Sequence, residues 1–167
     1  MSDEVRIRRG TAADAARLKE IGVTGWETTY AGFVTPENRL KYLNGAFWSI
    51  ERLREVSGDD ASILLVAAID EHPIGFITIE PHDEDEYELT RLYVDPGVRS
   101  GGIGRRLWDE SLARLRDRAA ESVLVNVFGD NWAGRRFYER LGFVLTVETT
   151  TDVGTQTVYD VWYRLEL

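Results

Sequence analysis

The chain has 167 residues, of which 43% are hydrophobic, so we expect a single domain over residues 1–167. It contains no cysteine, which excludes disulfides, thiol nucleophiles and cysteine-bound zinc. The net charge of −9 disfavours nucleic acid as a partner and favours cationic ligands, unless the acidity serves solubility alone. No apolar run reaches the roughly 18 residues of a membrane helix, and the charged start lacks a signal-peptide pattern. We therefore expect a cytoplasmic protein that makes no membrane contact.

Hydrophobic periodicity and helix-start signals predict the elements. In chain order these are a strand at 5–9, a helix from Thr11 to about Tyr30, short helices from Thr35 to Val56, strands at 63–69, 74–79 and 87–94, a helix after the turn that ends at Gly104, a strand at 123–128, a helix at 131–141, and a closing hairpin of strands at 143–150 and 155–165. Strands and helices that alternate in this order predict a mixed α/β sheet with helices on both faces.

A glycine-rich turn over residues 95–104 joins a predicted strand to a predicted helix. Glycine allows close approach of the backbone to a ligand, and the first N–H groups of a helix bind anions. Arg99 and Arg105 add positive charge, so the turn suits a pyrophosphate. It is neither a Walker loop, which needs Gly-Lys-Ser/Thr, nor a dinucleotide fingerprint on the first βα turn. A nucleotide-binding domain and a plain strand-to-helix turn stay open as alternatives.

Within this turn, Arg99, Gly102 and Gly104 resemble the R/Q-x-x-G-x-G/A signature of the GNAT N-acetyltransferases. The resemblance implies a mixed, mostly antiparallel, splayed sheet of about seven strands, with acetyl-CoA in its V-shaped opening and no metal ion. It also implies a bulge in the preceding strand. The implied cofactor contacts are the strand residues Leu92, Tyr93 and Val94 and the loop residues Val98, Arg99, Ser100, Gly101, Gly102, Ile103, Gly104 and Arg105.

A second motif lies in the helix predicted at 131–141. Asn131, Arg135 and Tyr138 share one helix face by their spacing, and an apolar set is expected to face the core from the other side: Ala133, Phe137 and Leu141. The segment resembles the family pattern N-x-x-A-x-x-x-Y-x-x-x-G-F, with Gly134 where alanine is common. The resemblance implies that Asn131 binds the pantetheine or acetyl region, with Arg135 on the same cofactor-facing side. It implies that Tyr138 is the general acid for the departing thiolate.

Glu88 is our candidate for the general base, because GNAT histone acetyltransferases carry a basic glutamate at the similar strand position. Strand alternation places Glu88, Thr90, Leu92 and Val94 on one face unless a bulge shifts the register. Attraction of a cationic substrate, or a place on a solvated acidic edge, are alternative roles for Glu88. Ribosomal-protein acetyltransferases carry their glutamate where this chain has Asn126, which cannot act as a base. This leaves Glu88 or a water relay.

Trp26, Glu27 and Tyr30 lie in a segment similar to the W-x-x-T-Y-x-G segment of GNATs that include polyamine acetyltransferases. The resemblance implies an acceptor pocket in which two rings and a carboxylate suit a cationic amine. The alternative interpretation is that both aromatic residues belong to the core. The acidic run at 83–86 is interpreted as a solvated loop or as a means of steering cations.

Together these features predict transfer of the acetyl group of acetyl-CoA to a primary amine by direct attack in a ternary complex. The acceptor is a small amine, a polyamine or a protein amine. The alternative is a non-catalytic module that binds or senses acyl-CoA. A homodimer is compatible with the sequence.

Overall fold

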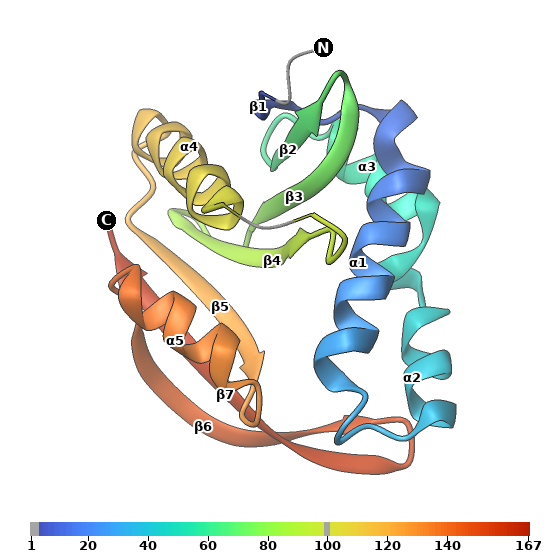
Figure 1. Ribbon diagram of the computed structural model, residues 1–167. Helices are drawn as coiled ribbons and strands as arrows, with labels where there is room; N and C mark the ends of the chain where they lie inside the picture. Colours follow the sequence, from blue (N-terminus) through green and yellow to red (C-terminus); the bar gives the residue numbers. More distant parts are fainter. Residues whose placement is uncertain (1–3, 99–100) are drawn as a thin grey trace.

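Within residues 4–98 and 101–167, which the computed structural model describes, seven strands form one open sheet in the order β1-β2-β3-β4-β5-β7-β6 (Figure 1). The strands are β1 (Arg6–Arg9), β2 (Ile63–Ile69), β3 (His72–Pro81), β4 (Glu86–Val94), β5 (Ser122–Phe128), β6 (Val144–Val153) and β7 (Gln156–Glu166). The helices are α1 (Ala15–Tyr30), α2 (Pro36–Leu43), α3 (Ile50–Gly58), α4 (Ile103–Asp117) and α5 (Trp132–Arg140), with 3-10 turns η1 (Ala12–Asp14) and η2 (Ala46–Trp48). Only the pair β4–β5 is parallel, so the predicted mixed, mostly antiparallel sheet is confirmed.

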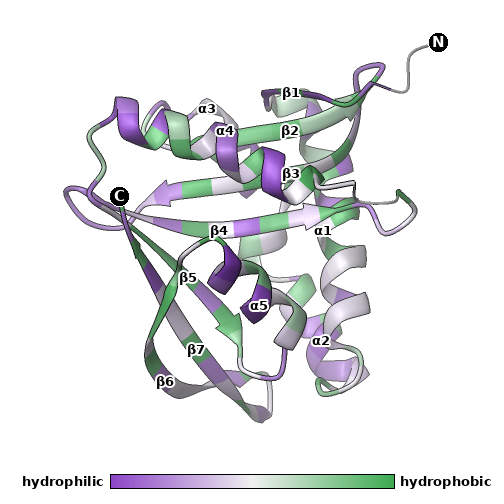
Figure 2. Cartoon of the chain, turned by 60° about the vertical axis from the view of Figure 1, so that its left-hand side comes forward, coloured by the Kyte–Doolittle hydropathy of each residue, from purple (hydrophilic) through white to green (hydrophobic). Residues whose placement is uncertain are grey.

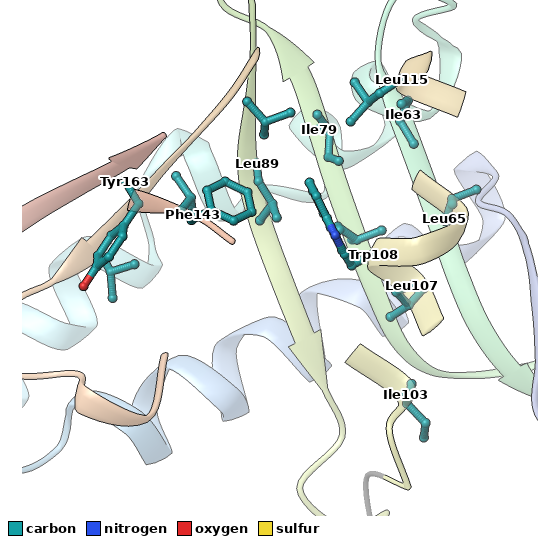
Figure 3. Packing of buried hydrophobic residues seen from close by; sticks show 14 of the residues in the cluster. Ile63, Leu65, Ile79, Leu89, Ile103, Leu107, Trp108, Leu115, Phe143 and Tyr163 are labelled. Carbon is teal, nitrogen blue, oxygen red and sulfur yellow. The ribbon is translucent and has the colours of Figure 1, made fainter. Parts of the chain in front are cut away.

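The sheet has a hydrophobic core on each face, because helices cover both sides. Helix α4 packs on β2, β3 and β4, and Figure 3 shows its Leu107 and Trp108 over the side chains of the sheet. Helices α1 and α3 cover the opposite face, where Leu64 and Val66 of β2 point, while Leu65 points toward α4. This two-sided burial explains the unbroken apolar run of β2, since neighbouring residues of a strand face opposite sides.

The predicted helix starts are confirmed. The backbone N–H of Thr11 donates to Asp14 Oδ2 at 2.8 Å in a capping box, and Thr35 accepts from Asn38 N at the start of α2. Helix α1 runs through its two glycines without a break. At Gly25 a Cβ atom would lie 2.8 Å from the Tyr93 ring, so this glycine lets α1 approach β4 closely.

The sheet opens between its two parallel strands. Strands β4 and β5 are in register only from Glu86–Ser122 to Leu89–Val125, although each continues for three or more residues beyond that point. Figures 1 and 2 show β5 turning away from β4 after this paired part, with α5 beside β5. The diverging ends leave strand edges that have no neighbouring strand, and backbone groups there are free to bind another molecule.

Candidate active site

A cavity of about 540 Å³ lies where β4 and β5 diverge. Its walls come from the free ends of the two strands, from the starts of α4 and α5, and from one side of α1. The lining residues are Gly25, Thr29, Tyr30, Leu89, Thr90, Arg91, Leu92, Tyr93, Val94, Gly102, Gly104, Arg105, Val125, Asn126, Val127, Asn131, Ala133, Gly134, Phe137 and Tyr138. A cavity of this volume, bounded by two helix starts, is of the size that holds a small-molecule ligand.

A β-bulge at Thr90 sets the geometry of the β4 wall. The ladder with β3 pairs Thr78 with Arg91 but Ile79 with Leu89, so Thr90 is the extra residue. Beyond the bulge, Leu92 packs on the α4 side, whereas Arg91 lies against Phe47 on the other face. The bulge that the resemblance implied is therefore present in this strand.

The backbone of Leu92, Tyr93 and Val94 has β3 on one edge and the cavity on the other. In a strand, successive residues point their N–H and C=O groups to alternate edges, so part of these groups faces the cavity. This is the arrangement expected for main-chain contacts to an extended ligand.

The glycine turn ends in the left-handed conformation needed to start α4. Gly102 is the N-cap with φ of 79°, and Gly101 has φ of 43°. No atom lies within 4 Å of a Cβ placed at Gly102, so conformation rather than space requires glycine there. The first N–H groups of α4 have no partner within the helix, and they carry the positive end of its dipole.

The loop residues expected at the cofactor are only partly brought together. Gly102, Gly104 and Arg105 line the cavity, whereas Val98 and Ile103 pack into the α4 core. Arg99 and Ser100 lie outside the described residues, and Gly101 is exposed but does not line the cavity.

Asn131 joins the start of α5 to α1. Its Oδ1 accepts from Gly134 N at 3.0 Å as an N-cap, and its Nδ2 donates to Tyr30 Oη at 3.1 Å. A Cβ at Gly134 would lie 2.6 Å from Asn131 Nδ2. Glycine in place of the usual alanine thus makes room for the asparagine side chain to fold over the helix start.

Tyr138 presents its phenol to the cavity. Its ring packs at 5.6 Å from Phe143, and its hydroxyl has no hydrogen-bond partner among the described residues. Burial raises the pKa of Tyr138 well above its ordinary value, and nearby Tyr30 adds to the rise. The hydroxyl therefore carries its proton at neutral pH and is available as a donor.

The predicted faces of α5 are only partly right, because Asn131 and Tyr138 line the cavity but Arg135 does not. Arg135 is 7% exposed and points away from the cavity, where its Nε donates to Tyr163 Oη at 2.9 Å and its Nη1 to the Gly129 carbonyl at 3.0 Å. Ala133 and Phe137, expected in the core, line the cavity instead. A guanidinium that donates through Nε and Nη1 can occupy the interior, and Ala133 and Phe137 then face the ligand space. Arg135 therefore links α5 to β7 and to the Gly129 backbone, outside the lining of the cavity.

Glu88 lies beside the cavity rather than in its lining. It pairs with Glu80 of β3, and its Oε2 is 3.6 Å from His82 Nδ1. Because of the bulge, Glu88 shares its face with Arg91, not with Leu92 and Val94 as simple alternation predicts. Burial raises the pKa of Glu88 above its ordinary value, against a smaller lowering effect of His82.

The three residues predicted to bind the acceptor do not lie together in the structure. Trp26 is 3% exposed and stacks on Tyr42 in the core, and Glu27 is exposed and absent from the cavity wall. Tyr30 does line the cavity, and burial raises the pKa of its hydroxyl to about 12, against the lowering effect of the Asn131 hydrogen bond. The core interpretation of Trp26 is thus the correct one.

Sequence reasoning missed Asp160 of β7. It is 4% exposed, and its Oδ2 accepts from Asn126 Nδ2 at 2.8 Å. Burial raises the pKa of its carboxyl, while hydrogen bonds from Asn126 and the Val161 backbone lower it less strongly. The sequence signal that could have identified Asp160 is its place in an alternating strand, at a position where an apolar residue facing the core is expected.

Among residues 4–98 and 101–167 no group of His, Asp or Glu side chains could hold a metal ion. None of the helices in these ranges is long and apolar enough to cross a membrane.

Residues 26–143 match the family model described as the acetyltransferase (GNAT) family. The chain belongs to the GNAT acetyltransferase family. It superimposes with a TM-score of 0.79 on the PaiA N-acetyltransferase of Thermoplasma acidophilum, solved in complex with coenzyme A, at 25% identity over 94% of this chain and 98% of that one. The expected fold and enzyme class, an acetyltransferase, are confirmed at the level of the family.

Two curated relatives extend the comparison for this GNAT chain. Mycothiol acetyltransferase of Gordonia bronchialis is 32% identical over 83% of the chain, and an uncharacterised N-acetyltransferase of Mycobacterium tuberculosis is 27% identical over 84%. The match covers 90% of the mycobacterial protein, but the chain spans about half the length of the mycothiol acetyltransferases.

Proposed function

We propose that this protein transfers the acetyl group of acetyl-CoA to a primary amine of a small amine, a polyamine or a protein. The observation that carries the proposal is the cavity between β4 and β5, which brings a free strand edge, a glycine-capped helix start and the Tyr138 phenol together. The PaiA N-acetyltransferase, which has the same fold, was solved with coenzyme A, and this supports the choice of cofactor.

The residues present fit acetyl-CoA. The open N–H groups at the start of α4 and the side chain of Arg105 would hold the diphosphate, since both are complementary to an anion. The free edge of Leu92 to Val94 would bind the amides of the pantetheine arm. When bound, acetyl-CoA would supply a thioester. Its carbonyl carbon gains a bond to the amine nitrogen and loses its bond to the sulfur of CoA.

Tyr138 donates its proton to the thiolate that leaves. Its raised pKa keeps the hydroxyl protonated until that charge develops. Glu88 takes the proton that the amine loses, through water, because its carboxylate lies outside the cavity lining. The raised pKa of Glu88 makes it a stronger base than an ordinary glutamate. No covalent intermediate with the protein is required.

The test is release of free thiol from acetyl-CoA in the presence of a panel of amines, including a diamine, a triamine and a lysine peptide. Turnover with at least one amine, together with a mass gain of one acetyl group on that amine, is expected. Binding of acetyl-CoA without turnover over the whole panel would favour a non-catalytic acyl-CoA-binding module and overturn the proposal.

A further inference from the structure

The buried carboxylate of Asp160 has no role in the reaction described above. Its Oδ1 is buried and has no hydrogen-bond partner among the described residues. A buried carboxylate with one unbonded oxygen and no cation beside it destabilises a fold, because its lost hydration is not replaced. Among residues 4–98 and 101–167 no Lys, Arg or His side chain forms an ion pair with Asp160, and its one side-chain hydrogen-bond partner is Asn126.

Asp160 fixes the orientation of an amide in the cavity wall. Asn126 Nδ2 donates to Asp160 Oδ2 at 2.8 Å and to the Val161 carbonyl at 3.2 Å, so β7 takes the donors of this side chain. The remaining polar atom is Oδ1, which can only accept. Because Asn126 lines the cavity, a bound molecule meets a hydrogen-bond acceptor there.

The groups around this pair also suit a cation. Tyr30 of α1 lines the cavity together with Asn126, and Phe128 of β5 is the cross-strand partner of Asp160. The rings of Tyr30 and Phe128 lie 4.9 Å apart on the same side of the sheet. Aromatic faces beside a buried negative charge attract an ammonium group and offer nothing comparable to a neutral alcohol.

We propose that Asn126 and Asp160 form the subsite that binds the ammonium group of the acceptor. Asn126 Oδ1 accepts an N–H of the acceptor, while Asp160, as a positioning residue, holds the amide in that orientation and supplies the negative charge behind it. The proposal rests on the proposed function, because it assumes that the acceptor enters this cavity as an amine. It predicts that charge at Asp160 selects amines over alcohols of equal size.

The test uses the full chain labelled with ¹⁵N and titrated, with and without saturating CoA, with n-butylammonium chloride or 1-butanol. The side-chain amide resonances of Asn126 are expected to shift with butylammonium and not with butanol. Asp160→Asn keeps an acceptor for Asn126 Nδ2 but removes the charge, and should weaken butylammonium binding about tenfold, the effect of one partly screened unit charge. Asp152→Asn, an exposed residue of β6, is the matched control and should bind like the parent.

Equal shifts with both probes, no shift at Asn126, or unchanged affinity in Asp160→Asn would each overturn the subsite. The transferase proposal fails separately. If the amine panel gives no turnover while Asn126 still prefers butylammonium, the subsite stands and the reaction is wrong. If turnover occurs but Asp160→Asn leaves both the KM of the amine and the butylammonium affinity unchanged, the reaction stands and the subsite is wrong.

Discussion

At the scale of single residues, the hydroxyl of Tyr138 is the group on which the proposed acid step depends. Tyr138→Phe removes that oxygen and leaves the ring contact with Phe143 in place. We expect kcat to fall by about 10²-fold, a typical contribution of a general acid, with the KM for acetyl-CoA changed by less than about twofold. Steady-state thiol release measures both constants. An unchanged kcat would remove Tyr138 from the acid role.

Glu88→Gln tests the base at the same scale. As a base Glu88 must be ionised, so the parent rate should rise with pH through the raised pKa of this carboxyl. We expect the variant to be slower at neutral pH and to regain part of its rate at higher pH, where more of the amine is already neutral. Glu84→Gln in the exposed neighbouring loop is the control. A pH profile identical to that of the parent would count against Glu88.

The variant Arg135→Met tests whether Arg135 stabilises the fold or binds the cofactor. Arg135→Met removes the guanidinium donors to Tyr163 Oη and to the Gly129 carbonyl, so we expect a loss of about 2 kcal/mol in unfolding free energy. The KM for acetyl-CoA should not change in the folded variant. Arg136→Met, on the exposed side of α5, should cost less than about 0.5 kcal/mol. Urea unfolding and kinetics check both, and a raised KM with unchanged stability would restore Arg135 to the cofactor site.

At the scale of elements, the two glycines at the start of α4 differ in whether the backbone conformation requires glycine. Gly102 has a φ of 79°, so Gly102→Ala should cost about 1–2 kcal/mol in unfolding free energy through backbone strain. Gly104 is helical, and a Cβ there would make ordinary contact with Phe137 at 3.6 Å. Gly104→Ala should therefore be neutral or stabilising by up to about 1 kcal/mol. Thermal unfolding of the pair measures the contrast, and equal losses in both variants would contradict it.

The elements were largely predictable because local rules determine them. Periodicity placed the strands to within two or three residues, and the capping patterns at Thr11 and Thr35 placed two helix starts. The orientation of α5 was not predictable from its own spacing. Ala133 and Phe137 of this helix line the ligand cavity, while Arg135 hydrogen-bonds to Tyr163 and Gly129 inside the fold.

The site was partly predictable for the same reason. The glycine turn and Tyr138 belong to short motifs, and the structure brings Gly102, Gly104, Asn131 and Tyr138 to one cavity. Asp160 was beyond reach, because its contact with Asn126 spans 34 residues and depends on β7 lying beside β5 in the sheet. Strand order is a property of the whole topology, and no local pattern encodes it.

At the scale of the whole molecule, the buried carboxylate ties stability to pH. A folded-state pKa raised above 3.8 means that the native state binds this proton more tightly than the unfolded chain does. The contribution of Asp160 to stability is thus full below pH 3.8 and is lost as the pH rises through the raised value. Above that value the ionised side chain lowers the unfolding free energy of the whole domain.

Asp160→Asn removes that cost, so we expect the variant to be more stable than the parent near pH 7.5. The gain should shrink as the pH falls toward 4, where the parent carboxyl is increasingly protonated in the native state. Urea unfolding at pH 4 and pH 7.5 measures it, with Asp152→Asn as a control for net charge. A variant less stable than the parent at pH 7.5 would contradict the argument. If Asp160→Asn is more stable than the parent but binds the amine more weakly, the domain retains the destabilising charge of Asp160 because the amine site uses it.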